Sequence, residues 1–196
     1  ITNFGTDEDG DGSKDGWAQA PSSDTEGIEY FDSALWVIAN EGSGWDAKRM
    51  VYKVNATTGD TEASANLKDY LDWIEDMGDI TNDGTNLVVW TKTNFNDVYK
   101  ISTTGEQVSQ NWVNGPSWQG SKGIAYHPVQ KTYYAANGTE LSKLDTTFNQ
   151  TGTANLSAAS GGTAMSDVQG MTFSDSSPYN DLWVVSGTRV YHSFIS

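Results

Sequence analysis

Short apolar runs alternate with polar turns along the chain, and this plan is repeated four times. Each unit opens with a glycine and a short apolar strand, passes through a polar turn and continues into a second, more hydrophobic strand. The second strands are the runs LWVIA, LVVWT, TYYAA and LWVVS, which begin at Leu35, Leu87, Thr132 and Leu182. Runs of strand-forming residues bounded by Gly, Asn, Asp and Pro predict β-strands between turns.

The repeats have a regular period. Their opening glycines are Gly27, Gly78, Gly123 and Gly170. One unit therefore occupies about 45 to 50 residues, which is the range of a propeller blade. A third strand follows in every unit, and in three units a turn and a fourth strand come after it. The sequence predicts an all-β fold: a β-propeller of four blades, each with about four antiparallel strands, in which the blades start near residues 27, 78, 123 and 170.

The second strands are apolar on both faces, which predicts that they are buried between neighbouring blades. Trp36, Trp90 and Trp183 lie in these runs and are expected in the core. Only residues 64–78 have helical spacing, and they predict one short helix between blades one and two. The apolar stripe of this segment consists of Leu67, Tyr70, Leu71 and Ile74.

Two blade openings carry a resemblance to a known group of proteins. DTEGIEY (24–30) and DVQGMTF (167–173) each place an acidic residue shortly before a glycine and a strand. SKGIAY and DMGDIT follow this pattern more loosely. In this respect residues 24–196 resemble bacterial β-propellers of the broad NHL and regucalcin-like type. The resemblance implies a fold, and it leaves the function open.

An acidic loop precedes the repeats, in the stretch TDEDGDGSKDGW. Its four aspartates are Asp7, Asp9, Asp11 and Asp15. The first three occupy positions one, three and five of a calcium loop, Gly12 provides the turn at six, the carbonyl of Ser13 is available at seven, and Asp15 stands at nine. Ala18 takes the place of the bidentate glutamate at twelve, so the loop is no complete EF-hand.

The same stretch resembles the calcium repeats of thrombospondin type 3 and dockerin-like segments, which implies that Ca²⁺ is bound with a final ligand from elsewhere in the chain. The alternative is a merely solvated acidic tail. The predicted organisation is an N-terminal strand and calcium-binding loop over residues 1–23 and the propeller over residues 24–196.

Composition narrows the classes of partner and location. The 26 acidic and 11 basic residues give a formal net charge of −15. This charge opposes binding to nucleic acid and to anionic lipid, and no apolar run is long enough for membrane insertion. The chain contains no cysteine. Together with the calcium-type loop, these features favour an extracellular or cell-surface location over the alternative of an acidic domain from any compartment.

Catalytic signatures are scarce. The sequence contains no G-x-S-x-G, Walker, H-E-x-x-H or G-x-G-x-x-G motif, and His127 and His192 fall at different places in their repeats. Polar residues next to the first strands are expected to line the central channel, where they would bind a second cation. These residues are Glu26, Asp76, Asp79, Asp167 and Gln169. The alternative is that they cap turns and accept backbone hydrogen bonds.

Three tryptophans fall in loops rich in Gly, Asn and Pro: Trp45, Trp112 and Trp118. Exposed aromatic rings beside polar groups suit a carbohydrate or protein ligand, although loop tryptophans also hold loops onto blades. The preferred function is a non-enzymatic, extracellular, calcium-stabilised propeller for binding, adhesion or assembly. The alternative is a propeller hydrolase or lactonase that uses a channel-bound metal.

The chain ends complete the set of predictions. The fourth repeat stops after its third strand, and ITNF at the N-terminus has a strand-like alternation. We expect ITNF to pair with the strand around residues 190–194, either within one molecule, which closes the ring, or between molecules, which leads to self-assembly. Closure within one molecule is favoured because the connection is short.

Overall fold

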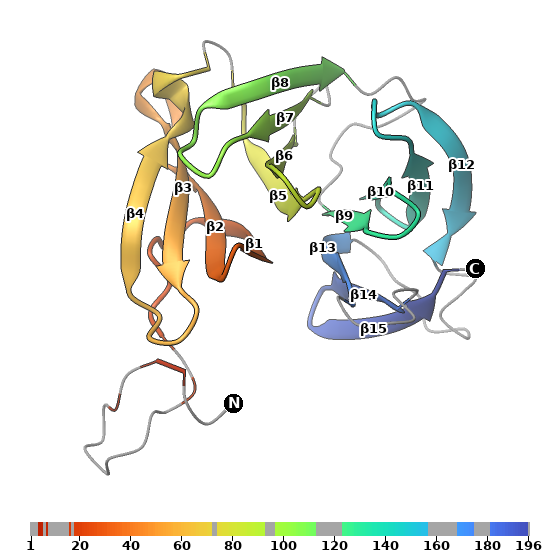
Figure 1. Ribbon diagram of the computed structural model, residues 1–196, viewed down its shortest axis with the longest axis horizontal. Coiled ribbons are helices and arrows are strands. Elements are labelled where there is room, and N and C mark those ends of the chain that lie inside the picture. The colour runs from red at the N-terminus through yellow and green to blue at the C-terminus, as the bar shows by residue number, and fades with distance from the viewer. Residues whose placement is uncertain are drawn as a thin grey trace.

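The computed structural model describes residues 4–5, 7, 16, 18–71, 74–92, 97–112, 123–156, 168–174 and 181–195. In this part of the chain, four antiparallel β-sheets surround a common centre as the blades of a propeller (Figure 1). The strands of each sheet follow one another in chain order from the centre outward. The predicted all-β, four-bladed propeller is confirmed.

The blades contain three or four strands each. Blade 1 consists of β1 (Thr25–Phe31), β2 (Ala34–Glu41), β3 (Lys48–Asn55) and β4 (Thr61–Asn66). Blade 2 consists of β5 (Met77–Asn82), β6 (Leu87–Thr91), β7 (Asp97–Ile101) and β8 (Gln107–Trp112). Blade 3 consists of β9 (Gly123–His127), β10 (Thr132–Asn137), β11 (Glu140–Leu144) and β12 (Gln150–Asn155). Blade 4 consists of β13 (Val168–Phe173), β14 (Asp181–Ser186) and β15 (Arg189–Phe194).

The helix predicted over residues 64–78 is wrong. β4 continues to Asn66, and the chain then forms a single 3-10 turn, η2 (Leu67–Asp69), before β5 begins. A second turn of this kind, η1 (Gly44–Asp46), lies between β2 and β3. No helix of the described residues has the length and hydrophobicity needed to cross a membrane.

The apolar stripe of the expected helix has a different role. Leu67, Leu71 and Ile74 are buried in the core between blades 1 and 2, while Tyr70 is exposed. The side chain of Asn66 accepts a hydrogen bond from the backbone N–H of Lys68 at 3.3 Å, which caps the short turn. Packing against two blades therefore determines the backbone of this segment, and its local periodicity does not.

Apolar clusters between successive blades form the core. Ile38 and Ile80 belong to the cluster between blades 1 and 2. Trp90 and Tyr133 belong to the cluster between blades 2 and 3. Tyr134, Leu141, Leu182 and Val184 belong to the cluster between blades 3 and 4. The second strands are therefore buried on both faces wherever two blades flank them, as the sequence predicted.

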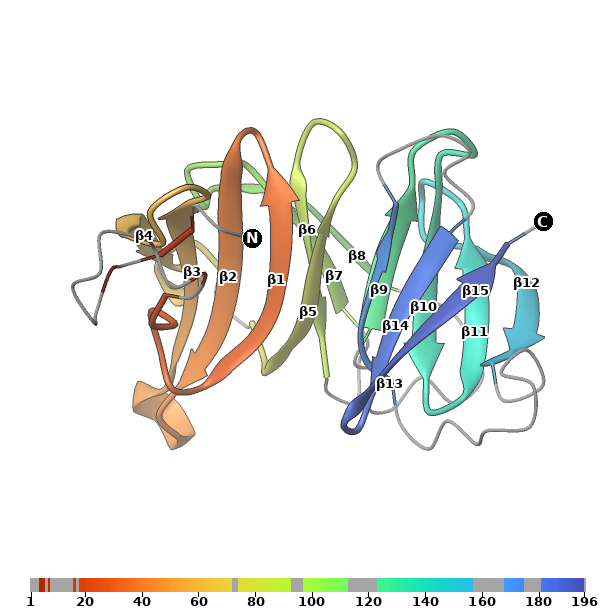
Figure 2. The same cartoon turned by 90° about the horizontal axis from the view of Figure 1, so that it is seen from below.

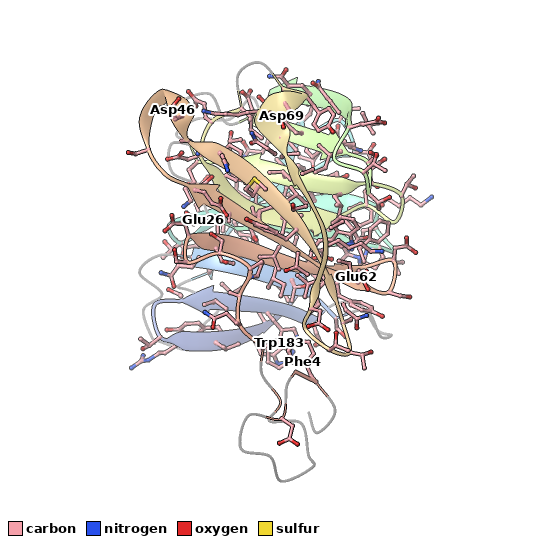
Figure 3. The ribbon with its side chains drawn as sticks, turned by 90° about the vertical axis from the view of Figure 1, so that its left-hand side faces the viewer. Phe4, Glu26, Asp46, Glu62, Asp69 and Trp183 are labelled. Atoms are coloured by element: carbon pink, nitrogen blue, oxygen red, sulfur yellow. The ribbon has the colours of Figure 1, made fainter. Side chains whose placement is uncertain are left out.

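One of the three strand tryptophans departs from the prediction. Trp36 and Trp90 are buried, but Trp183 on β14 is 43% exposed, so its expected place in the core is wrong. Trp183 lies on the side of blade 4 that faces blade 1 (Figure 3). Within the described part of the chain, no other blade covers this side.

The ring is open between blades 1 and 4. β1 packs against β5, β5 against β9, and β9 against β13, whereas among the described residues β1 and β13 approach each other much less closely. Figure 2 looks into this opening, with β1 on one side, β13 on the other and β5 behind them. We call this opening the wedge, and we define it by Ile28 and Tyr30 of blade 1 and Trp183 and Val185 of blade 4.

The N-terminal segment meets the outer part of blade 1. Phe4 accepts a backbone hydrogen bond from Gly16 at 3.0 Å. A Cβ atom added to Gly59, in the turn between β3 and β4, would lie 2.1 Å from Cβ of Ala18 and 3.4 Å from Phe4. Figure 3 shows Phe4 where this segment leaves the body of the molecule.

The predicted pairing of ITNF with β15 falls largely outside the described residues, because Ile1, Thr2 and Asn3 are not among them. Phe4, the one described residue of ITNF, lies at blade 1. The described part of the blade 4 sheet consists of β13, β14 and β15 alone.

Candidate functional site

Asp79 lies at the centre of the propeller and contacts all four inner strands. Its carboxylate accepts backbone N–H bonds from Ile80 and Ile124 at 2.9 Å each, and the backbone N–H of Met171 lies close enough to act on its pKa in the same direction. A Cβ atom added to Gly27 would lie 2.7 Å from the Asp79 carboxylate, so only glycine fits at this point of β1. Burial raises the pKa of Asp79 well above its ordinary value, although the N–H donors act in the opposite direction.

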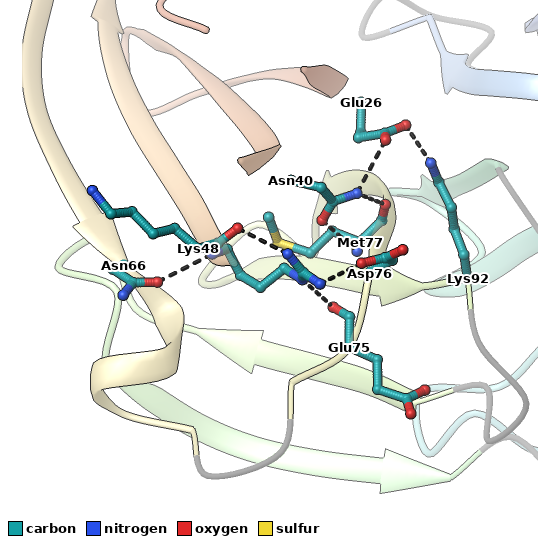
Figure 4. Close-up of polar contacts among 9 residues, drawn as sticks. Glu26, Asn40, Lys48, Asn66, Glu75, Asp76, Met77 and Lys92 are labelled. Carbon is teal, nitrogen blue, oxygen red and sulfur yellow. Dashed lines mark hydrogen bonds and ion pairs between the residues drawn. The ribbon is translucent and has the colours of Figure 1, made fainter. Parts of the chain in front are cut away.

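Glu26, another predicted channel residue, ties blade 1 to blade 2. It forms an ion pair with Lys92 and accepts a hydrogen bond from the side-chain amide of Asn40 at 3.0 Å (Figure 4). Asn40 also bonds the backbone N–H and carbonyl of Met77, each at 2.8 Å. The Glu26 carboxylate is therefore occupied by groups of the protein itself.

Asp76 lies apart from this centre, in an ion pair with Arg49 (Figure 4). The guanidinium of Arg49 also donates to the carbonyl of Glu75 at 3.1 Å. Arg49 is 8% exposed, so this pair clamps β3 of blade 1 onto the chain that enters β5.

The structure brings three of the five predicted channel residues to one place. Glu26, Asp79 and Gln169 line a cavity of about 240 Å³. Asp167 lies outside the described residues. Within the described part of the chain, no three His, Asp or Glu side chains are grouped in a way that could hold a metal ion.

The residues predicted to bind Ca²⁺, or a carbohydrate or protein ligand, lie mostly outside the described part of the chain. Asp7 is described and exposed, whereas Asp9, Asp11, Ser13 and Asp15 are not described. Trp118 and the side chains of Trp45 and Trp112 are not described either. The calcium site and the loop tryptophans therefore stay predictions.

Two cavities occupy the wedge. The cavity of about 240 Å³ is bordered by Ile28 and Met171 on the inner strands and by Val185 on β14. A larger cavity of about 480 Å³ lies towards the ends of the inner strands, where Tyr30, Thr81, Tyr126 and Phe173 border it. Trp183 and Thr172 line both cavities, so the two hollows run along one face of blade 4.

Strand pairing aligns the blades residue by residue and shows why the wedge is unusual. On the second strands, the equivalent partners of Gly27, Asp79, Gly123 and Gly170 are Ile38, Trp90, Ala136 and Val185. The first three of these partners are 0% exposed, and Val185 is 40% exposed. The same holds two positions earlier on the second strands, where Trp36, Val88 and Tyr134 are buried and Trp183 is 43% exposed.

Blade 1 shows the matching difference on its inner strand. Ile80, Ile124 and Met171 occupy equivalent positions and are buried against the preceding blade, but Ile28 is 58% exposed. Tyr30, two residues further along the same face, is also exposed. The wedge therefore presents two halves of a blade interface that do not meet. Sequence reasoning missed this site because each residue has a buried equivalent in another repeat.

Polar groups fix the walls of the wedge. The ring of Trp183 stacks on His192 with a centroid separation of 4.4 Å, and Nε2 of His192 lies 2.8 Å from Oδ1 of Asp181. At the larger cavity, the amide of Asn82 donates a hydrogen bond to Glu29. Burial and the nearby Asp83 raise the pKa of Tyr126 above its ordinary value.

Comparison with known proteins supports the fold alone. No family model matches the sequence, and no curated protein matches it. The computationally designed protein Ika4 is similar in structure, with a TM-score of 0.51 and 12% identity over 91% of this chain and 94% of that chain.

Two natural propellers are similar at the same level. The β-propeller domain of Myceliophteria thermophila Cps50 (Swd1) has a TM-score of 0.58 and 10% identity, over 90% of this chain and 53% of that chain. The WD40 domain of Neurospora crassa Pan2 has a TM-score of 0.50 and 9% identity, over 89% and 54%. This chain thus spans about half the length of both.

Proposed function

We propose that this chain is a binding module, built on an extracellular propeller that Ca²⁺ stabilises, and that its ligand occupies the wedge between blades 1 and 4. One observation carries the proposal: Ile28, Trp183 and Val185 are exposed at positions whose equivalents in the other blades are buried. A propeller is a general scaffold for binding, so the site has to be argued from its own residues.

The lining of the wedge supports a binding role. Exposed apolar side chains gathered around a hollow are typical of surfaces that bind a partner. The larger cavity, about 480 Å³, falls in the usual size range for ligand sites, roughly 300–1,000 Å³. Trp183 provides a flat aromatic face, and its stacking on His192 keeps that face in position for a ligand.

The bound Ca²⁺ and the extracellular location are proposed on the basis of the sequence. The spacing of Asp7, Asp9, Asp11 and Asp15 suits a hard cation, and the resulting loop precedes the segment that packs against blade 1. Bound Ca²⁺ would order this segment and so stabilise the blade.

The alternative of a hydrolase or lactonase with a channel metal has less support. Lys92 and Asn40 engage Glu26, and backbone N–H groups engage Asp79. A catalytic metal needs carboxylates that are available to it and an open coordination position.

A ligand screen tests the proposal. The protein is probed on an oligosaccharide microarray and with a phage-displayed random peptide library, in parallel with Trp183→Ser and Tyr70→Ser. Tyr70 is 52% exposed and directly follows η2, away from the wedge, so it is a matched control. We expect ligands that bind the wild type and Tyr70→Ser but not Trp183→Ser. Recovered ligands that all bind Trp183→Ser as tightly as the wild type would overturn the proposed site.

A further inference from the structure

We infer that the wedge receives an extended peptide whose apolar side chains alternate with basic ones. This inference rests on the proposed function and names the ligand class. The two cavities share Trp183 and Thr172 and follow the inner strands. β1, with 7 residues, is about 23 Å long at 3.3 Å per residue. A ligand that fills both cavities is therefore elongated, with a length of about five or six extended residues.

The apolar groups of the wedge follow the repeat of a strand. Ile28 and Tyr30 are two residues apart on β1, and Trp183 and Val185 are two residues apart on β14. Side chains at this spacing lie on one face of a strand, and a bound strand presents its own side chains at the same period. In the three closed interfaces, apolar side chains of the next blade cover the equivalent positions. An extended peptide with apolar residues at every second position is therefore complementary to the exposed apolar side chains of the wedge.

The charge of the wedge favours basic side chains at the intervening positions. Glu29 borders the larger cavity and provides its negative charge, whereas Glu26 at the smaller cavity is already paired with Lys92. Among the described residues that line either cavity there is no Lys, Arg or His, and the whole chain has a net charge of −15. An acidic groove attracts a cationic partner and repels an anionic one.

The lining of the smaller cavity favours a peptide ligand over a carbohydrate. Most of the surface that lines it is apolar, and Ile28, Met171, Val185 and Trp183 are its large apolar side chains. An apolar side chain gains free energy by leaving water for such a surface. The hydroxyl groups of a sugar chain would lose their hydrogen bonds to water there, with few partners in return.

Four synthetic probes test the ligand class. The probes are a hexapeptide that alternates leucine and lysine, one that alternates leucine and glutamate, one that alternates serine and lysine, and cellohexaose. Binding is measured by isothermal titration calorimetry at low and at high salt. We expect only the leucine–lysine peptide to bind well, with an affinity that falls as the salt concentration rises.

Variants locate the binding. Trp183→Ser should weaken the leucine–lysine peptide by about 30-fold or more, because a buried aromatic anchor dominates such an interface, and Trp183→Phe should restore part of the loss. Glu29→Gln should weaken it about threefold and reduce the salt dependence. The control Glu106→Gln removes an exposed carboxylate at the turn between β7 and β8 and should change the affinity little. A thermal unfolding curve confirms that each variant is folded.

Three results would overturn the inference. Equal binding of the serine–lysine peptide would show that charge alone attracts the probe. Equal binding of the leucine–glutamate peptide would show that charge has no part. Binding of cellohexaose that Trp183→Ser abolishes, without peptide binding, would replace the ligand class and leave the proposed function standing. The proposed function falls separately, if the ligands recovered in the screen do not require Trp183.

Discussion

Replacing Asp79 with alanine tests whether this carboxylate holds the blades together. The substitution leaves two N–H groups, those of Ile80 and Ile124, without their acceptor at a buried centre. A buried donor that loses its partner costs about 1–3 kcal/mol. Even the lower value gives a total of about 2 kcal/mol, which is a substantial part of the roughly 5–15 kcal/mol that stabilises a typical domain.

Asparagine at this position separates the role of charge from that of hydrogen bonding. Folding raises the pKa of Asp79, so the folded protein holds a proton that the unfolded chain releases. The linked stabilisation is fully present below the ordinary carboxyl pKa and is lost as the pH rises through the raised value. Asp79→Asn has no such group. Its stability deficit relative to the wild type should therefore be largest near pH 4 and shrink as the pH rises towards neutrality.

The assay is urea-induced unfolding, followed by circular dichroism from pH 4 to pH 8. Asp24→Ala provides the control, because Asp24 is exposed and precedes β1 without contributing to the centre. We expect Asp24→Ala to change the free energy of unfolding by no more than about 0.5 kcal/mol. An equally small change for Asp79→Ala would refute the role of this carboxylate as a tie between blades. A deficit of Asp79→Asn that does not vary with pH would refute the raised pKa.

Three further predictions concern the centre and the chain ends. Gly27→Ala should destabilise the protein by about 1–3 kcal/mol in urea unfolding, because the new Cβ would meet Asp79. The control Gly152→Ala should leave the stability unchanged, because its Cβ would have no neighbour closer than 3.9 Å. Calcium should bind EDTA-treated protein in calorimetry, and the double variant Asp9→Ala, Asp11→Ala should abolish this binding; unchanged heats would contradict the loop assignment. Deletion of residues 1–5 should lower the unfolding midpoint of a monomer if the segment acts within one molecule. If the segment links molecules, the deletion should convert larger species into monomers, as measured by light scattering. A protein unchanged in both respects would show that the segment does neither.

The repeat pattern was sufficient to predict the fold. Each unit repeats the same order of an opening glycine, an apolar strand and a polar turn, and the sheets of blades 1 to 4 follow this order. Such patterns are readable because they depend on neighbours along the chain: alternation sets the exposed face of a strand, and turn residues set its ends. The same local reading failed for residues 64–78, where contacts with two blades override the helical spacing of Leu67, Leu71 and Ile74.

The candidate site depended on the tertiary structure. Trp183 and Trp36 occupy equivalent places in similar runs, LWVVS and LWVIA, and yet one is half-exposed and the other buried. Asp79 stands among several acidic residues near first strands, and only the convergence of four strands makes it the central acceptor. The sequence by itself determined the strands, the turns and the blade count, because these follow from local periodicity. Which blade faces remain uncovered, and which carboxylate lies at the centre, was decided by the packing of the blades against one another, which depends on contacts between residues far apart in the chain.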